Sequence, residues 1–179
     1  RVIGLVLAAG IGSRFGSSPP KVFQPLLGRK MVEYPLAALS AAGITESFVV
    51  NQKRFAAEVP VERKNLLFQK RASGTGDAVL TARRMIGKER ATLVVINGDN
   101  PLFTGDTIRR FLDHHIREGA FCSFAACEVD DPTGYGRVLL KRGAFAGIIE
   151  ERNLKPSQRR ISLINAGLYA FEAPEVFDW

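Results

Sequence analysis

The residue types best suited to chemistry lie in segment 7–21 (LAAGIGSRFGSSPPK), directly after the apolar run Val2–Leu7. This segment combines three glycines with two cations, Arg14 and Lys21. Glycine lets a backbone approach an anion closely, and cationic side chains neutralise the anion's charge. The pattern is therefore typical of a phosphate-binding loop that follows a first parallel strand.

Two better-known phosphate-binding loops are excluded by the spacing of these residues. A dinucleotide-binding loop requires G-x-G-x-x-G, but Phe15 stands where the third glycine should be. That loop also opens a helix at once, which Pro19-Pro20 prevents, and needs an acid at the end of the next strand, where Asn51-Gln52 stand. No G-x-x-x-x-G-K-[ST] can be read, so the ATPase loop is excluded as well.

A second candidate for chemistry is Asp99, which closely follows the apolar run Thr92–Ile96. In open α/β sheets, ligands collect at the carboxyl ends of the strands, so an acid at this place is a candidate metal ligand. The alternative is that Asp99 caps a turn before Pro101. Position alone does not decide between the two interpretations.

The two histidines do not form a candidate metal site. His114 and His115 are neighbours on a predicted helix and point about 100° apart, so they cannot share a metal ion. His115 continues an apolar stripe, which predicts a packing role.

Cys122 and Cys127 fall on opposite faces of one predicted strand, roughly 17 Å apart along it. That separation excludes a disulfide, and we expect two buried, reduced thiols.

The elements that must position these residues are short apolar runs alternating with helical patterns. This arrangement is typical of an α/β protein with a mostly parallel sheet covered on both faces. After residue 119 strands follow one another without long helices between them. We therefore predict one domain, 1–179, with a nucleotide-binding half (1–119) and a β-rich half (120–179). Strands are predicted at 2–7, 47–50, 66–68, 92–96, 121–129, 137–140, 145–150 and 161–171, and helices at 31–42, 77–86 and 105–118, with short helices within 52–64 and from 174.

Composition narrows the class of protein. The chain has 179 residues, of which 46% are hydrophobic and 24% charged, as in an ordinary globular domain. We found no apolar run of about 18 residues and no secretory signal, so we expect a cytoplasmic protein without a membrane partner. The net charge of +7 suits an anionic partner, but the basic residues are spread in pairs among acids. This favours a solvated surface over nucleic-acid binding.

Together the motifs resemble those of the sugar-nucleotide pyrophosphorylases, most closely the uridyltransferase domain of the bifunctional N-acetylglucosamine-1-phosphate uridyltransferases. The resemblance covers essentially the whole chain. It implies a Rossmann-like three-layer nucleotidyltransferase fold of the GT-A-like kind, with a mixed, mostly parallel sheet and a β-rich acceptor half. The motifs are LAAGIGSR (7–14), PK (20–21), FQ (68–69), GTGDAV (74–79), NGDNPL (97–102), DDPTGYGR (130–137), GIIE (147–150) and INAG (164–167).

The resemblance also implies a reaction, in which UTP and N-acetylglucosamine 1-phosphate give UDP-N-acetylglucosamine and pyrophosphate with Mg²⁺ as cofactor. It assigns roles to residues of four kinds. Uridine is held at Ala8, Gly10, Gln69, Gly74 and Thr75; the UTP phosphates are contacted by the catalytic residues Arg14 and Lys21; Mg²⁺ is bound by Asp99; and the sugar phosphate is held by Gly136, Glu150 and Asn165.

These residue types suit the implied chemistry. The attacking phosphate monoester is already ionised, so no general base is needed, and the barrier is the repulsion between two polyanions. Cations and positioning lower such a barrier. The fork of Arg14 suits the leaving β- and γ-phosphates, and the compact charge of Lys21 suits the α-phosphate. Structural alternatives remain: Gln69 as a polar strand end, Glu150 as a surface partner of Arg137 or Arg152, and Gly136 as a turn glycine.

Several departures from the family pattern leave other functions open. Ala72 stands where a second base-contacting Gln is usual, and Asn97 replaces an aromatic residue beside the metal ligand. The chain stops at Trp179, before an Asn that supplies a second metal ligand, and without the domain that trimerises the full-length family, so oligomerisation is not predicted. The alternatives are a thymidylyl- or cytidylyltransferase of the same fold and a non-catalytic nucleotide-binding fragment.

Overall fold

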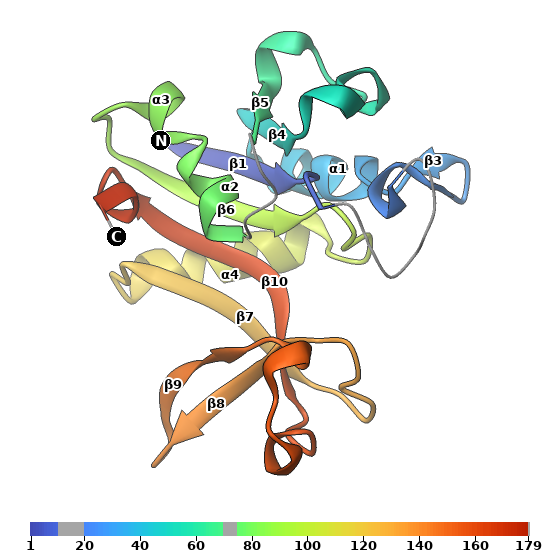
Figure 1. Ribbon diagram of the computed structural model, residues 1–179. Helices are drawn as coiled ribbons and strands as arrows, with labels where there is room; N and C mark the ends of the chain where they lie inside the picture. Colours follow the sequence, from blue (N-terminus) through green and yellow to red (C-terminus); the bar gives the residue numbers. More distant parts are fainter. Residues whose placement is uncertain (11–19, 70–74, 179) are drawn as a thin grey trace. The chain divides into compact units, whose positions relative to one another are not determined.

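The computed structural model describes residues 1–10, 20–69 and 75–178, and the chain divides into two compact units (Figure 1). The first unit comprises Arg1–Ser123 together with the residues from Tyr169 onward, and the second is Phe124–Leu168. The predicted halves divide at residue 119. In the structure the boundary lies at Ser123, and the last strand returns the chain to the first unit. Each unit is described by itself below.

The sheet of the first unit is built from the buried apolar runs of the sequence. Its order is β5-β4-β1-β6, followed by the part of β10 that belongs to this unit. The first four strands are parallel, and Leu7 at the end of β1 lies opposite Val50 of β4 and Asn97 of β6. Their carboxyl ends therefore meet at one edge. The bounds are β1 Val2–Leu7, β4 Ser47–Asn51, β5 Leu66–Phe68 and β6 Ala91–Asn97.

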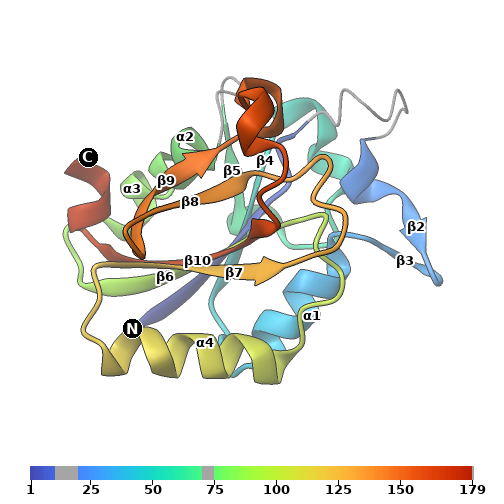
Figure 2. The ribbon, with the colours of Figure 1, turned by 90° about the horizontal axis from the view of Figure 1, so that it is seen from below.

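Helices cover both faces of this sheet, as Figures 1 and 2 show. Helices α1 (Glu33–Ala41) and α4 (Gly105–Arg117) pack on one face, and α2 (Thr75–Leu80) and α3 (Arg83–Ile86) on the other. Residues of α2, α3 and the sheet share a core of fully buried side chains. The predicted three-layer α/β arrangement is confirmed. The core residues include Ile3, Leu5, Val50, Ala78, Val79, Ala82, Ile86, Leu93 and Val95.

The helix predicted at 77–86 is two short helices, α2 and α3. Between them, both the backbone N–H and the hydroxyl of Thr81 donate to the carbonyl oxygen of Ala78, at 3.2 and 2.6 Å. A Thr side chain that bonds a nearby carbonyl competes with the helical pattern, which accounts for the break.

The connections contain elements that periodicity does not reveal. The 3-10 turn η1 (Lys21–Phe23) leads to a hairpin of β2 (Pro25–Leu26) and β3 (Arg29–Lys30), which was not predicted. Its turn residues Leu27 and Gly28 have φ of 48° and 85°, as a two-residue hairpin turn requires, but leucine is not a residue that signals it. The single short helix expected within 52–64 is two 3-10 helices, η2 (Lys53–Glu58) and η3 (Arg63–Asn65).

Strands predominate in the second unit, as predicted. Here β8 (Arg137–Lys141) and β9 (Ala144–Ile149) form an antiparallel hairpin. The first part of β10 (Leu163–Ala173) pairs with β8 through Ile164 and Arg137. The remaining elements are β7 (Cys122–Glu128), which enters this unit from the first, η4 (Glu151–Asn153) and η5 (Pro156–Gln158), while η6 (Glu175–Asp178) stands in the first unit where a helix was expected.

The packing role predicted for His115 is confirmed, since the side chain is only 1% exposed. Its partners are polar: Nδ1 lies 2.8 Å from the Ser123 hydroxyl, and Nε2 lies 3.0 Å from the Glu172 carboxylate.

Cys122 and Cys127 are free, as expected, but the prediction that they are buried was wrong, because both are exposed. In the part of the chain that the structure describes, no helix is long and apolar enough to cross a membrane.

Candidate functional site

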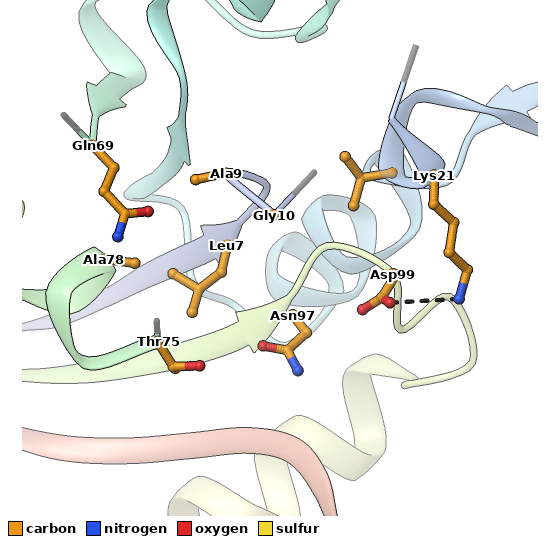
Figure 3. Close-up of a pocket in the computed structure, with 10 residues that line it drawn as sticks. Leu7, Ala9, Gly10, Lys21, Gln69, Thr75, Ala78, Asn97 and Asp99 are labelled. Carbon is orange, nitrogen blue, oxygen red and sulfur yellow. Dashed lines mark hydrogen bonds and ion pairs between the residues drawn. The ribbon is translucent and has the colours of Figure 1, made fainter. Parts of the chain in front are cut away.

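A cavity of about 280 Å³ opens at the edge of the first unit's sheet where the parallel strands end (Figure 3). Strands β1, β5 and β6 contribute their carboxyl ends, and the first turns of η1 and α2 complete the wall. This is the place at which open α/β sheets bind ligands. The lining residues are Leu7, Ala9, Gly10, Lys21, Val22, Gln69, Thr75, Ala78, Asn97 and Asp99.

Lys21 and Asp99, which are 78 positions apart in sequence, meet on this wall. The Lys21 Nζ lies 3.4 Å from Asp99 Oδ2, and each side chain remains about two-fifths exposed, at 39% and 42%. The pair is therefore hydrated and adjustable, and an exposed pair of this kind contributes little to stability. A cation and a carboxylate are thus placed side by side at the cavity without being essential to the fold.

Gly98 explains how Asp99 reaches the cavity. The Gly98 N–H donates to the carbonyl oxygen of Leu7 at 2.9 Å, which ties the loop after β6 to the end of β1. A Cβ on Gly98 would lie 2.9 Å from that same oxygen, closer than real Cβ atoms come. Because only glycine allows this approach, the chain turns here and delivers Asp99 to the wall.

The start of the segment predicted to bind phosphate is held by the neighbouring strand. The Ala8 N–H donates to the Val50 carbonyl at 2.8 Å, and the Gln52 amide donates to the Ala9 carbonyl at 2.6 Å. Ala8 is 1% exposed and lies behind the wall, whereas Ala9 and Gly10 line the cavity. Arg14 and Gly74, which the sequence places in the same site, lie outside the described residues.

Gln69 and Thr75, both predicted to hold the uridine, line the cavity. Gln69 follows β5 directly and is only 5% exposed, and its Nε2 donates to Oδ2 of Asp77 at 2.6 Å. Thr75 is the first residue of α2. The structure therefore brings Gly10, Lys21, Gln69, Thr75 and Asp99 to one cavity.

The donor set at the cavity suits a hard cation. Asp99 offers carboxylate oxygens and Asn97 an amide oxygen, and Mg²⁺ prefers one or two carboxylates with water and substrate oxygens as its other ligands. Across residues 1–10, 20–69 and 75–178 there is no cluster of three or more His, Cys, Asp or Glu side chains that could enclose a metal. An ion held by Asp99 and Asn97 would take its other oxygens from water and substrate.

The second unit brings together the three residues predicted to hold a sugar phosphate. The Asn165 N–H donates to the Gly136 carbonyl at 2.9 Å, and a Cβ built on Gly136 would lie 3.5 Å from Oε1 of Glu150. The three residues stand one position beyond the paired row Ile149, Arg137 and Ile164 of β9, β8 and β10. They thus occupy adjacent positions at the same level of three neighbouring strands.

Arg137 supports this group from within the second unit. It is 1% exposed, its Nη1 donates to the Tyr135 carbonyl, and its Nη2 lies 2.8 Å from the Glu151 carboxylate. Tyr135 and Glu151 are the immediate chain neighbours of Gly136 and Glu150. Arg137 therefore connects the two backbones that carry those residues.

The turn before Gly136 is stabilised locally. Asp131 Oδ1 accepts the Thr133 N–H at 3.0 Å, in the Asp-Pro-Thr part of the DDPTGYGR motif. The side chain and the backbone N–H of Thr133 both lower the pKa of Asp131, in that order of importance. The carboxylate is therefore held ionised as the cap of the turn.

Sequence reasoning missed Gln52, Asp77 and Arg137 as supports of the site. For Gln52 the available signal was a polar residue directly after a buried strand. For Asp77 it was an acid in the first turn of the helix that follows the GTG sequence. Arg137 was visible as the last residue of DDPTGYGR but was considered only as a surface partner of Glu150, whereas in the structure it is buried and pairs with Glu151. In each case the missing information was the contact across elements, which periodicity does not contain.

The fold and these residues define a class of protein: residues 3–179 match the nucleotidyl transferase family, and the chain belongs to it. The Bifunctional protein GlmU of Syntrophotalea carbinolica is 35% identical over 177 residues, which are 97% of this chain and 38% of that protein. The protein of the same description from Pelotomaculum thermopropionicum is 36% identical, over 97% of this chain and 39% of its own length. The chain thus spans less than two-fifths of these curated relatives.

Solved structures agree on the fold. A Bacillus anthracis protein assigned as a glucose-1-phosphate thymidylyltransferase superposes with a TM-score of 0.78 at 23% identity, covering 98% of this chain and 73% of its own. A UDP-glucose pyrophosphorylase complexed with UDP-glucose gives 0.76 at 20% identity, covering 99% and 78%. The expected nucleotidyltransferase fold and the resemblance to the uridyltransferase domain are confirmed.

Proposed function

We propose that this chain is a sugar-nucleotide nucleotidyltransferase that joins UTP and N-acetylglucosamine 1-phosphate to give UDP-N-acetylglucosamine and pyrophosphate. The observation that carries the proposal is the cavity that gathers Gly10, Lys21, Gln69, Thr75 and Asp99 at the carboxyl ends of β1, β5 and β6. Family membership supports nucleotidyl transfer in general. The particular base and sugar are inferred from the resemblance to the GlmU relatives, of which this chain spans 38–39%.

In the proposed reaction, a phosphate oxygen of the sugar phosphate attacks the α-phosphorus of UTP in line with the leaving group. A new phosphorus–oxygen bond forms, the bond to the bridging oxygen breaks, and its electron pair leaves with pyrophosphate. The nucleophile is already an anion, so no base has to remove a proton. Accordingly, neither histidine lines the cavity. Catalysis then depends on orientation and on cations placed where negative charge accumulates.

Lys21 and Arg14 have separate roles in this proposal. Lys21 stands on the cavity wall and, as a compact point charge, neutralises the α-phosphate under attack. Its present partner Asp99, at 3.4 Å, is hydrated and can exchange for a phosphate oxygen. Arg14, whose position is not described, is assigned to the leaving β- and γ-phosphates on its planar, permanently charged fork.

Asp99 is the residue proposed to hold Mg²⁺. Its carboxylate faces the cavity beside the Asn97 amide, and substrate oxygens and water complete the coordination that this ion prefers. When bound, the ion would supply positive charge that offsets the negative charge of the phosphates. Asp99 itself contributes a negatively charged anchor, and the close approach of Gly98 to β1 determines where its backbone lies.

Gly136, Glu150 and Asn165 are proposed to hold the sugar phosphate. Glu150 supplies acceptors for sugar hydroxyls, and Asn165 supplies an amide with both donor and acceptor. Asn165 Oδ1 accepts the Gly167 N–H at 3.1 Å, which fixes the direction of its amide. The three positions share one level of the sheet, so a single ligand can contact all of them.

The proposal is tested by measuring pyrophosphate release from UTP, CTP, TTP, ATP and GTP, each with N-acetylglucosamine 1-phosphate and other sugar 1-phosphates. We expect UTP with N-acetylglucosamine 1-phosphate to be the best pair and EDTA to abolish release. Equal rates for another pair would identify a different nucleotidyltransferase of this family. Absence of release from every pair, together with measurable UTP binding, would establish the non-catalytic alternative.

Gly136→Ala is expected to weaken binding of the sugar phosphate without affecting UTP. The added Cβ would lie 3.1 Å from the Ile148 methyl, which must shift to make room, and 3.5 Å from the Glu150 carboxylate, where it would occupy space next to that group. We expect a roughly tenfold rise in the KM for the sugar phosphate, since about 1.4 kcal/mol of binding energy corresponds to that factor. Steady-state kinetics with each substrate varied in turn measures both constants. An unchanged sugar-phosphate KM would remove Gly136 from the site.

A further inference from the structure

Asp77 is an acid that supports Gln69 beside the cavity without lining the cavity itself. It lies in the first turn of α2, is exposed, and accepts a hydrogen bond of 2.6 Å from Nε2 of Gln69. Gln69 itself is 5% exposed and lines the cavity. The carboxylate of Asp77, on α2, therefore orients the amide of Gln69, which follows β5.

The contact determines which end of the Gln69 amide faces the ligand. A carboxylate has only acceptors, so the amide nitrogen must point to Asp77 and the carbonyl oxygen must lie on the other side. Figure 3 shows this arrangement, with the oxygen directed toward the side formed by Leu7 and Ala9 and the nitrogen toward the helix that carries Ala78. Without such a partner, a Gln amide can present either end.

We propose that Asp77 sets the base preference of the site by holding Gln69 with its acceptor toward the cavity. The site then takes a pyrimidine nucleoside triphosphate whose base carries an imino N–H, uracil or thymine, in preference to cytosine. This inference rests on the proposed function, and it narrows the alternatives that the sequence left open by disfavouring a cytidylyltransferase.

The selectivity follows from the pattern of donors on the bases. On the pairing edge of uracil or thymine, the imino N3–H is the only donor, and it can donate to Gln69 Oε1. Cytosine placed in the same position brings an unprotonated N3, an acceptor, against that oxygen. Because Gln69 is only 5% exposed, Gln69 Oε1 and cytosine N3 would face each other without a hydrogen bond and with little water to replace it. We therefore expect the wild type to bind UTP about 10- to 100-fold more tightly than CTP.

The experiment measures the Kd of UTP and of CTP by calorimetry, without sugar phosphate, for the wild type and three variants. In Asp77→Asn, the new amide satisfies Gln69 in either orientation, so the UTP preference should fall at least about fivefold. In Gln69→Glu, two carboxylates face each other and UTP binding should weaken. The double variant Gln69→Glu/Asp77→Asn lets the introduced amide donate to the introduced carboxylate and returns an acceptor to the cavity, so UTP preference should recover.

The double variant separates orientation from a merely structural role, because a general loss of packing would not be repaired by a second change. Asp113→Asn, the same substitution at an exposed position of α4, is the matched control and should leave both constants unchanged. The proposal is overturned if the wild type does not prefer UTP, if Asp77→Asn keeps the wild-type ratio, or if the double variant does not recover it.

The outcomes for the proposed function are distinct from these. Preferential UTP binding that is lost in Asp77→Asn, with no pyrophosphate release from any pair, would support this inference and refute the proposed reaction. Pyrophosphate release from UTP, with a ratio of the UTP and CTP Kd values that Asp77→Asn leaves unchanged, would support the proposed reaction and refute this inference.

Discussion

Asp99→Asn is expected to lower the rate of Mg²⁺-dependent pyrophosphate release at least about 100-fold, which corresponds to about 2.7 kcal/mol of transition-state stabilisation. The substitution keeps the shape of the side chain and removes its charge, so the proposed metal anchor is lost while the cavity keeps its form. Lys21 also loses the ion partner that lies 3.4 Å from its Nζ. The rate is measured over a range of Mg²⁺ concentrations, because a weakened metal site is partly rescued at high concentration.

The fold should tolerate this change. Asp99 is two-fifths exposed, at 42%, and an exposed ion pair contributes only about 0–1 kcal/mol to stability. The thermal unfolding midpoint of Asp99→Asn should therefore stay close to that of the wild type. Asp113→Asn serves here too as the control for a change of one charge, and it should retain full activity. Wild-type rates in Asp99→Asn would exclude Asp99 from the site.

Arg137→Met is expected to lower the free energy of unfolding by about 3–5 kcal/mol, as loss of one partner of a buried ion pair does. Arg137 is almost completely buried, while the Glu151 side chain is 27% exposed, so the carboxylate would lose its cation with only partial access to water. The carbonyl of Tyr135 would lose a donor as well. Urea unfolding followed by circular dichroism measures the change.

A second variant distinguishes lost pairing from poor packing. In Arg137→Met/Glu151→Leu both charges are removed together, and apolar pairs of similar volume often replace a buried ion pair at little cost. We expect the double variant to recover most of the lost stability. A cost below about 1 kcal/mol for Arg137→Met alone would mean that the pair is as weak as an exposed one.

The same pair has a functional consequence. Arg137 connects the neighbours of Gly136 and Glu150, so its loss should loosen two of the three positions proposed to hold the sugar phosphate. The cavity of the first unit involves none of these residues. At a temperature where Arg137→Met is still folded, we therefore expect a raised KM for the sugar phosphate and an unchanged Kd for UTP.

Much of the fold could be read from local patterns. The strand Val2–Leu7 was predicted with its observed bounds, and the strand predicted at 92–96 is one residue longer at each end in the structure, where it is Ala91–Asn97. These elements are continuous apolar runs with abrupt polar ends. The hairpin of β2 and β3 was missed because its strands are two residues long and its turn begins with Leu27 at φ 48°. The break between α2 and α3 was missed because it depends on one Thr hydroxyl.

Part of the candidate site could likewise be predicted from local patterns, and part could not. Local patterns alone identified segment 7–21 and the acid Asp99, because glycine, charge and position after a strand are visible in one dimension. Gln69 and Glu150 were assigned to the site only by the resemblance. Spacing also excluded the dinucleotide and ATPase loops. The resemblance then supplied roles that spacing could not provide.

What only the tertiary structure decided is which of these groups meet and how each is oriented. Lys21 meets Asp99 because Gly98 packs against the end of β1, and Gln69 turns its oxygen to the cavity because Asp77 holds its nitrogen. Gly136, Glu150 and Asn165 stand at one level because β8, β9 and β10 pair in a particular register. Such contacts join residues far apart in sequence, and a local pattern of hydropathy carries no information about the register or direction in which distant segments approach each other.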